Sequence, residues 1–137
     1  MLMKKDIPQL KVADLAVAIA PRKEEGVEAE LWDTFLLNLK DEPILNVLVS
    51  SRGYGEVDGE QLETTTLRHF FEEIPPLSAA QIEPIQTSLF GLNNEYWVSF
   101  SLNNYMYDKK YTFLQGSISE DYFTVIPLLE CEGVMIR

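Results

Sequence analysis

The chain has 137 residues, of which 22 are acidic and 11 basic, so its formal net charge at neutral pH is −11. A chain of this length is predicted to form one domain around one hydrophobic core. The overall charge would repel a polyanion, so we expect no nucleic-acid binding. Hydrophobic residues make up 46% of the chain, which is typical of a globular domain rather than a disordered one.

Neither export nor membrane insertion is expected from the sequence. Cys131 is the only cysteine, so it has no second cysteine in the chain with which to form a disulfide. The apolar run from Leu15 to Ala20 is too short for a secretory signal or a membrane span. We therefore expect a cytoplasmic protein, not bound to membranes, with a flexible tail over residues 1–7.

Two strands are predicted in the first forty residues. Val12 to Ala20 alternates larger and smaller side chains, and Pro21 is expected to end this strand. Leu31 to Lys40 is apolar on both faces, which is typical of a central strand. The charged segment 22–26 between them is expected to be a loop.

A long hairpin is predicted around Asp58 and Gly59, a pair that favours a tight type I′ turn. A two-residue loop there sets the register, and the tip is acidic, contains glycine and should protrude into solvent. The register places these residues opposite one another: Val57 and Glu60, Arg52 and Thr65, Ser50 and Leu67, Leu48 and His69, and Val47 and Phe70.

Two segments after this turn allow alternative interpretations. The apolar residues of Leu67–Ile74 have helical spacing, but the preceding threonines and the turn favour a strand. Ser78 to Gln86 is predicted to be either a helical turn opened by Ser78 or an edge strand, because Pro84 limits a helix. Residues 87–94 are expected to form a loop.

A second hairpin is predicted around Asn103 and Asn104, because asparagine tolerates the left-handed dihedral angles of a tight turn. Nine of the fifteen aromatic residues lie between Asn94 and Phe123. Alternation predicts a core-facing side made of Tyr96, Val98, Phe100, Leu102, Tyr105, Tyr107, Tyr111 and Phe113, with Lys109 as the exception. The opposite side carries Trp97, Ser99, Ser101, Met106, Asp108 and Lys110.

The C-terminal part is predicted to contain a turn over residues 119–121, a strand from Tyr122 to Cys131 and a short strand from Val134 to Arg137. Pro127 suggests an edge or a bulge in the longer of these strands. The whole pattern predicts a mainly β protein, an antiparallel β-sandwich or a strongly bent sheet. We expect about seven or eight strands and at most one short helix.

No catalytic, cofactor or metal motif is recognisable in the sequence. His69 is the only histidine, so the chain cannot supply two histidines to one metal. A nucleophile pair of His69 and Cys131 lacks any supporting local motif, and packing roles are expected for both. The acids around Asp58 and Gly59 do not have the spacing of an EF-hand loop, so we expect a solvated hairpin tip and no metal.

Trp97 is the most informative candidate for function, and two interpretations of it are open. Either another layer of the fold covers its side of the hairpin, or the indole is exposed among polar neighbours, as in a protein-interface hot spot. In the second case the candidate interaction face comprises Trp97, Ser99, Met106 and Lys110.

Three segments of the sequence also carry a family resemblance. The segments 94–100 and 106–111, together with the glycine-bearing segment 52–59, resemble a small, uncharacterised bacterial family of stand-alone proteins of about this length. The resemblance implies a bacterial origin and no particular site residues. Some proteins of this appearance carry names borrowed from phenylalanyl-tRNA synthetase. The sequence has no catalytic motif of a class II synthetase, so such a relationship is the weaker alternative.

We therefore expect a non-enzymatic protein-binding or assembly module that contacts a protein partner or a second copy of itself. The alternative is a small-ligand-binding protein or an enzyme that uses acidic residues. A flat aromatic patch would favour the first, whereas a deep pocket lined by two or more convergent acids would favour the second.

Overall fold

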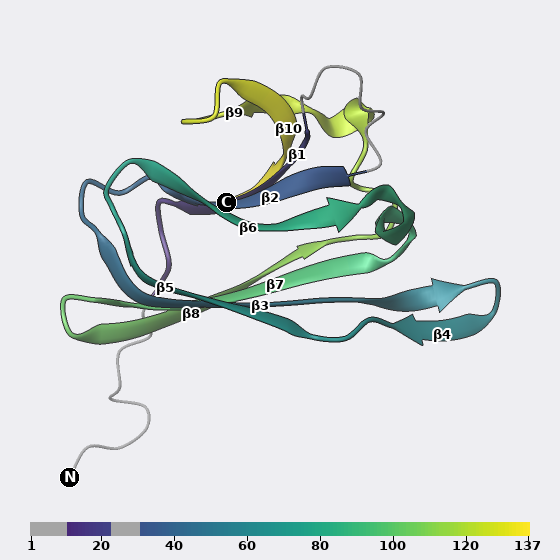
Figure 1. Ribbon diagram of the computed structural model, residues 1–137, viewed down its shortest axis with the longest axis horizontal. Coiled ribbons are helices and arrows are strands. Elements are labelled where there is room, and N and C mark those ends of the chain that lie inside the picture. The colour runs from purple at the N-terminus through teal and green to yellow at the C-terminus, as the bar shows by residue number, and fades with distance from the viewer. Residues whose placement is uncertain (1–10, 23–30) are drawn as a thin grey trace, which may run out of the picture.

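The computed structural model describes residues 11–22 and 31–137, which form two five-stranded antiparallel sheets packed together (Figure 1). The predicted β-sandwich is confirmed, although it has ten strands rather than seven or eight. The described residues contain no α-helix, only 3₁₀ helices at Thr87–Gly91 and Glu120–Tyr122. The tail predicted for residues 1–7 and most of the predicted loop 22–26 lie outside the described residues.

One sheet, called here the terminal sheet, has the strand order β6-β2-β1-β10-β9. The predicted strand near the N-terminus begins at Leu15 rather than Val12, and the predicted central strand β2 is indeed flanked on both sides. The segment from Ser78 is an edge strand and not a helical turn. The strands are β1 (Leu15–Pro21), β2 (Leu31–Asn38), β6 (Ser78–Gln86), β9 (Thr124–Ile126) and β10 (Cys131–Ile136).

The other sheet, called here the hairpin sheet, is centred on the long strand β3. This strand pairs with β7 on one side and with β4 and then β5 on the other. The strand interpretation of Leu67–Ile74 is confirmed, and the β3–β4 tip protrudes as predicted (Figure 1). The strands are β3 (Ile44–Val57), β4 (Glu60–Glu63), β5 (Leu67–Ile74), β7 (Asn93–Leu102) and β8 (Tyr105–Phe113).

The hairpin of β7 and β8 has the predicted register along its whole length, from Leu102 opposite Tyr105 to Asn94 opposite Phe113. Asn103 and Asn104 have φ angles of 52° and 67°, as a type I′ turn requires. The turn chemistry of two asparagines therefore sets nine consecutive cross-strand pairs.

The register predicted for β3 and β5 is wrong by one residue. Val57 faces Glu60 as expected, but Leu48 faces Phe70 rather than His69, and Ser51 rather than Ser50 faces Leu67. The returning chain has three residues, 64–66, between the paired segments, whereas β3 has two, 52 and 53. This extra residue forms a β-bulge. Because of it, the side chains of β5 that were predicted to face the core face solvent, and those predicted to face solvent face the core.

The C-terminal strands also differ from the prediction. The segment from Tyr122 to Cys131 is not one strand, because β9 ends before Pro127 and a turn with positive φ at Leu128 and Glu130 leads into β10. Gly133 lies inside β10, where a Cβ would be 2.4 Å from the carbonyl oxygen of Ile19. The loop predicted for residues 87–94 instead contains a 3₁₀ helix and the start of β7.

The core lies between the two sheets, where Tyr96, Val98, Phe100, Tyr111 and Phe113 are buried as predicted. Tyr105 was placed on this side but is 55% exposed. Figure 1 shows the tip of the β7–β8 hairpin, where Tyr105 begins β8, reaching past the strands of the terminal sheet. Leu102 and Tyr107, next to the tip, are partly buried.

Candidate functional site

Trp97 lies on the outer side of the hairpin sheet and is 46% exposed, so no second layer formed by the described residues covers it. It sits in the middle of β7, opposite Ser50 of β3 and Lys110 of β8. Alternation along β7 explains this position, because its neighbours Tyr96 and Val98 point into the core. The interpretation in which another layer covers the indole is therefore wrong.

The exposed apolar residues on this side extend well beyond Trp97. Leu48 is opposite Ser99 and Phe70, and Leu45 is opposite Ser101, which in turn faces Met106. These pairings place the residues on neighbouring strands of one sheet surface. We call this surface the outer face, and its exposed large apolar residues are Leu45, Leu48, Phe70, Trp97 and Met106.

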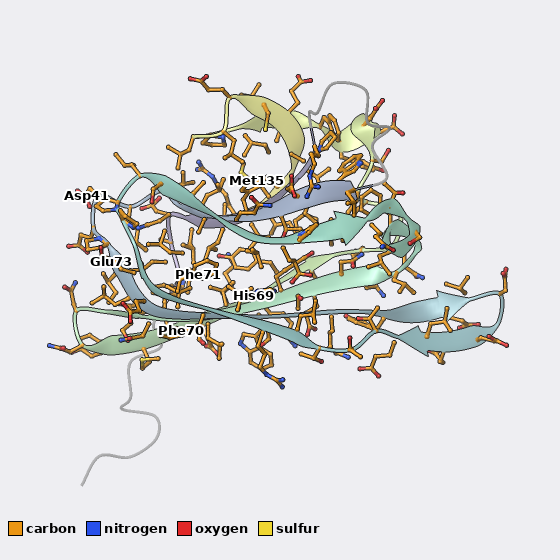
Figure 2. The ribbon with its side chains drawn as sticks, viewed as in Figure 1. Asp41, His69, Phe70, Phe71, Glu73 and Met135 are labelled. Atoms are coloured by element: carbon orange, nitrogen blue, oxygen red, sulfur yellow. The ribbon has the colours of Figure 1, made fainter. Side chains whose placement is uncertain are left out.

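Phe70 is the most important residue of the outer face that sequence reasoning missed. It is 60% exposed and projects away from the core, whereas His69 and Phe71 project toward the terminal sheet (Figure 2). The predicted register set it beside Val47, which is fully buried. The available signal was that the predicted register sets the charged Arg68 opposite Val49 and Glu73 opposite Ile44, both apolar.

The predicted residues of the interaction face do lie together. Trp97 packs under the ammonium of Lys110, with Nζ 4.7 Å from the ring centroid, and its Nε1 donates to Asp108 at 3.2 Å. Ser99, two residues after Trp97 on β7, is partly buried. Met106 Sδ accepts a hydrogen bond of 3.2 Å from the hydroxyl of Ser101. These contacts hold the indole and the thioether in fixed positions.

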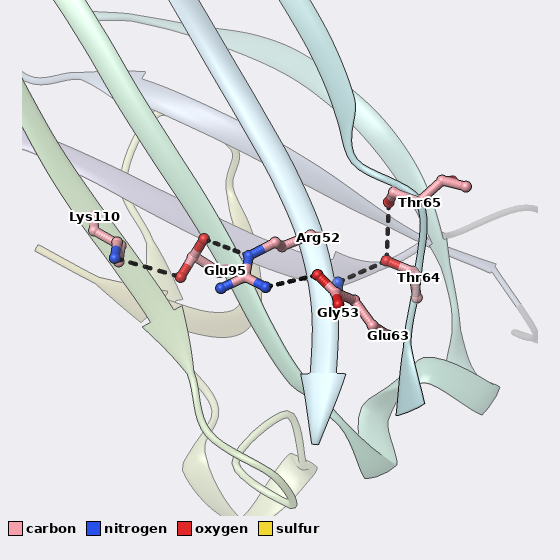
Figure 3. A network of polar contacts seen from close by, with 7 residues as sticks. All are labelled: Arg52, Gly53, Glu63, Thr64, Thr65, Glu95 and Lys110. Atoms are coloured by element: carbon pink, nitrogen blue, oxygen red, sulfur yellow. Dashed lines mark hydrogen bonds and ion pairs between the residues drawn. The ribbon is translucent and has the colours of Figure 1, made fainter. Parts of the chain in front are cut away.

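Figure 3 shows a chain of ion pairs across the outer face, and Lys110 at one end of it packs on the Trp97 ring. The carboxylate of Glu95 is only 8% exposed and lies 3.0 Å from Arg52 Nε and 3.6 Å from Lys110 Nζ. Arg52 also pairs with Glu63 at 2.9 Å. The hydrogen bonds from Arg52 to Glu95 and then Glu63 raise the pKa of the guanidinium, which stays charged. The network fixes the two cations next to the indole.

A shallow hollow of about 270 Å³ lies between these cations and Trp97. Arg68 reaches it from β5 and has no ion-pair partner among the described residues. The hollow therefore holds three cations and one carboxylate in an otherwise acidic chain. Its lining residues are Ser50, Ser51, Arg52, Thr66, Arg68, Glu95, Trp97 and Lys110.

A second polar cluster joins the two sheets on the inner side. Glu83 of β6 accepts a hydrogen bond of 2.5 Å from the Ser51 hydroxyl, and the same oxygen lies 2.9 Å from His69 Nε2. In a serine-type catalytic triad the histidine stands between the nucleophile and the acid. Here Glu83 stands between them, so the cluster has the arrangement of a polar link between sheets rather than that of a triad.

A bulge in β6 helps to place Glu83 in this cluster. Its neighbour Ile82 has no partner on β2, and the Thr34 hydroxyl donates to the Glu83 carbonyl at 2.8 Å and accepts from the Glu83 amide at 3.1 Å. Burial raises the pKa of the nearby Tyr96 hydroxyl well above its ordinary value, and the charge of Glu83 raises it further. The tyrosine is therefore held in its neutral form.

The cavity next to this cluster has a volume of about 170 Å³, and of the residues that the structure describes, Glu83 is the only acidic one that lines it. Cys131 lies in β10 of the terminal sheet, whereas His69 lies in β5 of the hairpin sheet and pairs with Glu83. Among residues 11–22 and 31–137, no group of three or more histidine, cysteine or acidic residues is placed to hold a metal ion.

Comparison of the chain with protein-family models, with curated proteins and with solved structures finds no match. In the described part of the chain, no helix has the length and apolar character needed to cross a membrane. Function must therefore be inferred from the outer face and the cluster around Glu83.

Proposed function

We propose that this chain is a non-enzymatic protein-binding module that docks through its outer face. The observation that carries the proposal is the exposed Trp97 on a rigid strand, surrounded by further exposed apolar side chains on three neighbouring strands. Contiguous apolar surface of this kind is uncommon on monomeric proteins and is typical of interaction sites. Tryptophan at the centre of such a surface is typical of a hot spot.

The surroundings of Trp97 favour docking for two further reasons. Its ring is held by Lys110 and Asp108, so little side-chain entropy is lost when a partner covers it. The hollow beside it carries a local excess of cations. It therefore suits a protein segment that places an apolar side chain against the indole and a carboxylate or carbonyl oxygen over the hollow.

The cavity between the sheets gives less support to the alternative of a ligand-binding protein or enzyme. Such a function would need two or more acids converging in a deep pocket, whereas this cavity has the single carboxylate of Glu83. That carboxylate is already engaged by Ser51 and His69. We accordingly assign no cofactor, catalytic residue or metal to the chain.

The setting that we propose for this module follows from composition. The net charge of −11 argues against nucleic acid as the partner, and the lone Cys131 is consistent with the reducing conditions of the cytoplasm. The chain would act there as a single domain that is not attached to a membrane.

The test is the substitution Trp97→Ala, compared with Tyr105→Ala as the matched control. Both rings are exposed on the β7–β8 hairpin, but only Trp97 belongs to the outer face. Proteins captured by the immobilised parent from a native lysate should be lost with Trp97→Ala and retained with Tyr105→Ala. We expect the affinity for a captured partner to fall by about 2 kcal/mol or more.

The same variants separate docking from folding. Trp97→Ala should lower the free energy of unfolding in urea by less than about 1 kcal/mol, because the ring is half exposed. A fall of several kcal/mol, or equal loss of partners with Tyr105→Ala, would remove the case for Trp97 as an interface anchor.

A further inference from the structure

The four sheet edges of this sandwich differ in how they resist pairing with another chain. Pro84 and the bulge at Ile82 interrupt β6, and β9 has only three residues. The edge strand β8 carries Lys109 and Lys110 in its middle. Proline, lysine, bulges and short length are the usual protections of an exposed edge, because unpaired main-chain groups invite a further strand.

The edge strand β5 lacks these protections, and its charged residues Arg68, Glu72 and Glu73 carry both signs, so they do not repel a second copy of the same strand as charges of one sign would. It is eight residues long, without proline, lysine or an internal bulge, and its pairing with β3 leaves the opposite edge without a partner strand among the described residues. The acidic tip strand β4 continues the same edge but is separated from β5 by the bulge at residues 64–66. Within the hairpin sheet, β5 is therefore the edge best suited to accept another strand.

The outward side chains of β5 form a pattern that is symmetric about Phe70. Arg68 lies two residues before Phe70 and Glu72 two residues after it, and all three are exposed. Exposure alternates from Arg68 to Glu72, with His69 and Phe71 partly buried between them, so the three exposed residues share the outward side; the alternation ends at Glu73, because Ile74 is buried. When a second copy of this strand runs in the opposite direction with its Phe70 at the same level, the anion of one strand lies opposite the cation of the other. This is the pattern needed for an antiparallel pair made of two identical strands.

We propose that β5 pairs in an antiparallel manner with β5 of a second copy of this chain, about a two-fold axis at Phe70. In this register Arg68 faces Glu72 of the second copy, Glu72 faces the second Arg68, and the two Phe70 rings face each other. Opposite charges and aromatic rings directly across an antiparallel pair both stabilise it. A two-fold axis uses the same surface of both copies, as in most homodimers.

Charges farther from the axis support the same arrangement. Glu73 lies beyond Glu72 at one end of β5, whereas Arg52 and Lys110 lie on the side of Arg68. The two-fold axis brings the acidic end of each copy next to the basic end of the other. Two five-stranded hairpin sheets become one continuous sheet, and the two outer faces join into one larger surface. This inference goes beyond the proposed function, since Trp97 lies two strands away from the paired edge.

The first experiment is a charge exchange, with self-association measured by sedimentation equilibrium from micromolar to millimolar concentration. Arg68→Glu and Glu72→Arg should each weaken the dimer by about tenfold or more, because each replaces two attractive cross-strand pairs with repulsive ones. The double variant Arg68→Glu/Glu72→Arg should restore the dimer of the parent, because the exchanged pairs attract again. Both side chains are exposed, so folding should be unaffected, which urea unfolding checks.

Lys109→Glu on the opposite edge is the matched control, because it changes the net charge by the same amount as Arg68→Glu. It should leave the dimer unchanged. A monomeric parent at millimolar concentration, equal weakening by Lys109→Glu or failure of the double exchange to restore association would overturn the pairing. Trp97→Ala should leave this dimer intact, so failure of the β5 pairing and failure of the proposed docking face are separate results.

The second experiment tests the register directly in a Cys131→Ser background, in which no natural thiol remains. Phe70→Cys places one thiol on each side of the axis, at the Cα separation that a disulfide accepts, and mild oxidation should yield covalent dimers. Glu72→Cys places the two thiols four residues apart along the paired strands and should yield few. Similar yields for the two variants, or a higher yield for Glu72→Cys, would show that β5 does not pair about Phe70.

Discussion

The two long hairpins of the hairpin sheet begin from equivalent turns and behave differently. Asp58 and Gly59 have positive φ in one turn, as Asn103 and Asn104 do in the other. From the asparagine turn the register runs unbroken through nine pairs. From the Asp58 turn it runs through four pairs and then shifts by one residue before β5. A tight turn therefore controls the register only as far as that register places apolar side chains in the core.

Burial explains why the register of the Asp58 hairpin shifts before β5. Continued from the turn, it would set Arg68 opposite the fully buried Val49 and Glu73 opposite the fully buried Ile44. Two charged side chains would then enter the core at a large cost. The bulge instead sets Ile74 opposite Ile44 and turns Arg68 to solvent. In the β7–β8 hairpin no such conflict exists, because Tyr96, Val98 and Phe100 already alternate inward.

The largest expected effect is in the unbroken hairpin. Phe100 is fully buried and stacks on Tyr107, with ring centroids 5.2 Å apart. Phe100→Ala should lower the free energy of unfolding by about 3 to 5 kcal/mol, measured by urea denaturation. Tyr105→Ala on the exposed tip is the control and should cost much less. Equal costs would mean that the β7–β8 hairpin does not anchor the core.

The buried tyrosines of this hairpin should make the fold sensitive to alkali. Tyr96 and Tyr111 face each other, and burial raises the pKa of both hydroxyls well above the value near 10 of an unfolded chain. Only the unfolded state then ionises, so stability is complete below that value and falls as pH rises through it. One pH unit above it, each tyrosine should remove about 1.4 kcal/mol from the free energy of unfolding.

Urea unfolding of the parent and of Tyr111→Phe between pH 8 and pH 11 measures this effect. The chosen range brackets the ordinary tyrosine pKa of about 10. The variant should lose less stability over this interval than the parent does, although it also lacks the hydrogen bond from the Tyr111 hydroxyl to the Leu15 carbonyl. Parallel curves for the two proteins would show that Tyr111 ionises equally in both states.

Deletion of Thr65 tests the bulge that distinguishes the other hairpin. Without the extra residue, β5 must either present Arg68 to the core or strain the connection, so we expect a loss of about 2 kcal/mol or more. Thr65→Ala retains the residue count and should cost little, because the Thr65 side chain makes no hydrogen bond in the described structure. Unchanged stability after the deletion would mean that the register of β5 does not depend on the bulge.

The smallest expected effect concerns the asparagine turn itself. Asn104→Val should lower the free energy of unfolding by about 1 kcal/mol or more, because a β-branched residue tolerates positive φ poorly. Asn104→Gly should be neutral or slightly stabilising, because glycine adopts positive φ without steric cost. Thermal melting of both variants checks this, and a valine variant as stable as the parent would contradict the role assigned to the turn.

The fold class could be predicted from sequence because it depends on local signals. Alternation of buried and exposed residues and the two tight turns identified most strands and the complete β7–β8 register. The predicted strand count is too low in part because the bulge at residues 64–66 divides the returning strand of the Asp58 hairpin into β4 and β5. Pro127 indicates an edge or a bulge in one longer strand; in the structure it follows the end of β9, which is an edge strand of the terminal sheet.

The candidate site was predictable only in part. Alternation placed Trp97, Ser99, Met106 and Lys110 on one side of a hairpin, because residues two apart on a strand share a side. Phe70 and Arg68 joined them only through the bulge at residues 64–66, where burial of distant strands overruled the local turn. Whether a second layer covers Trp97 depends on how the sheets stack, and stacking sums contacts between segments far apart in the chain. The local alternation of side chains does not predict those contacts.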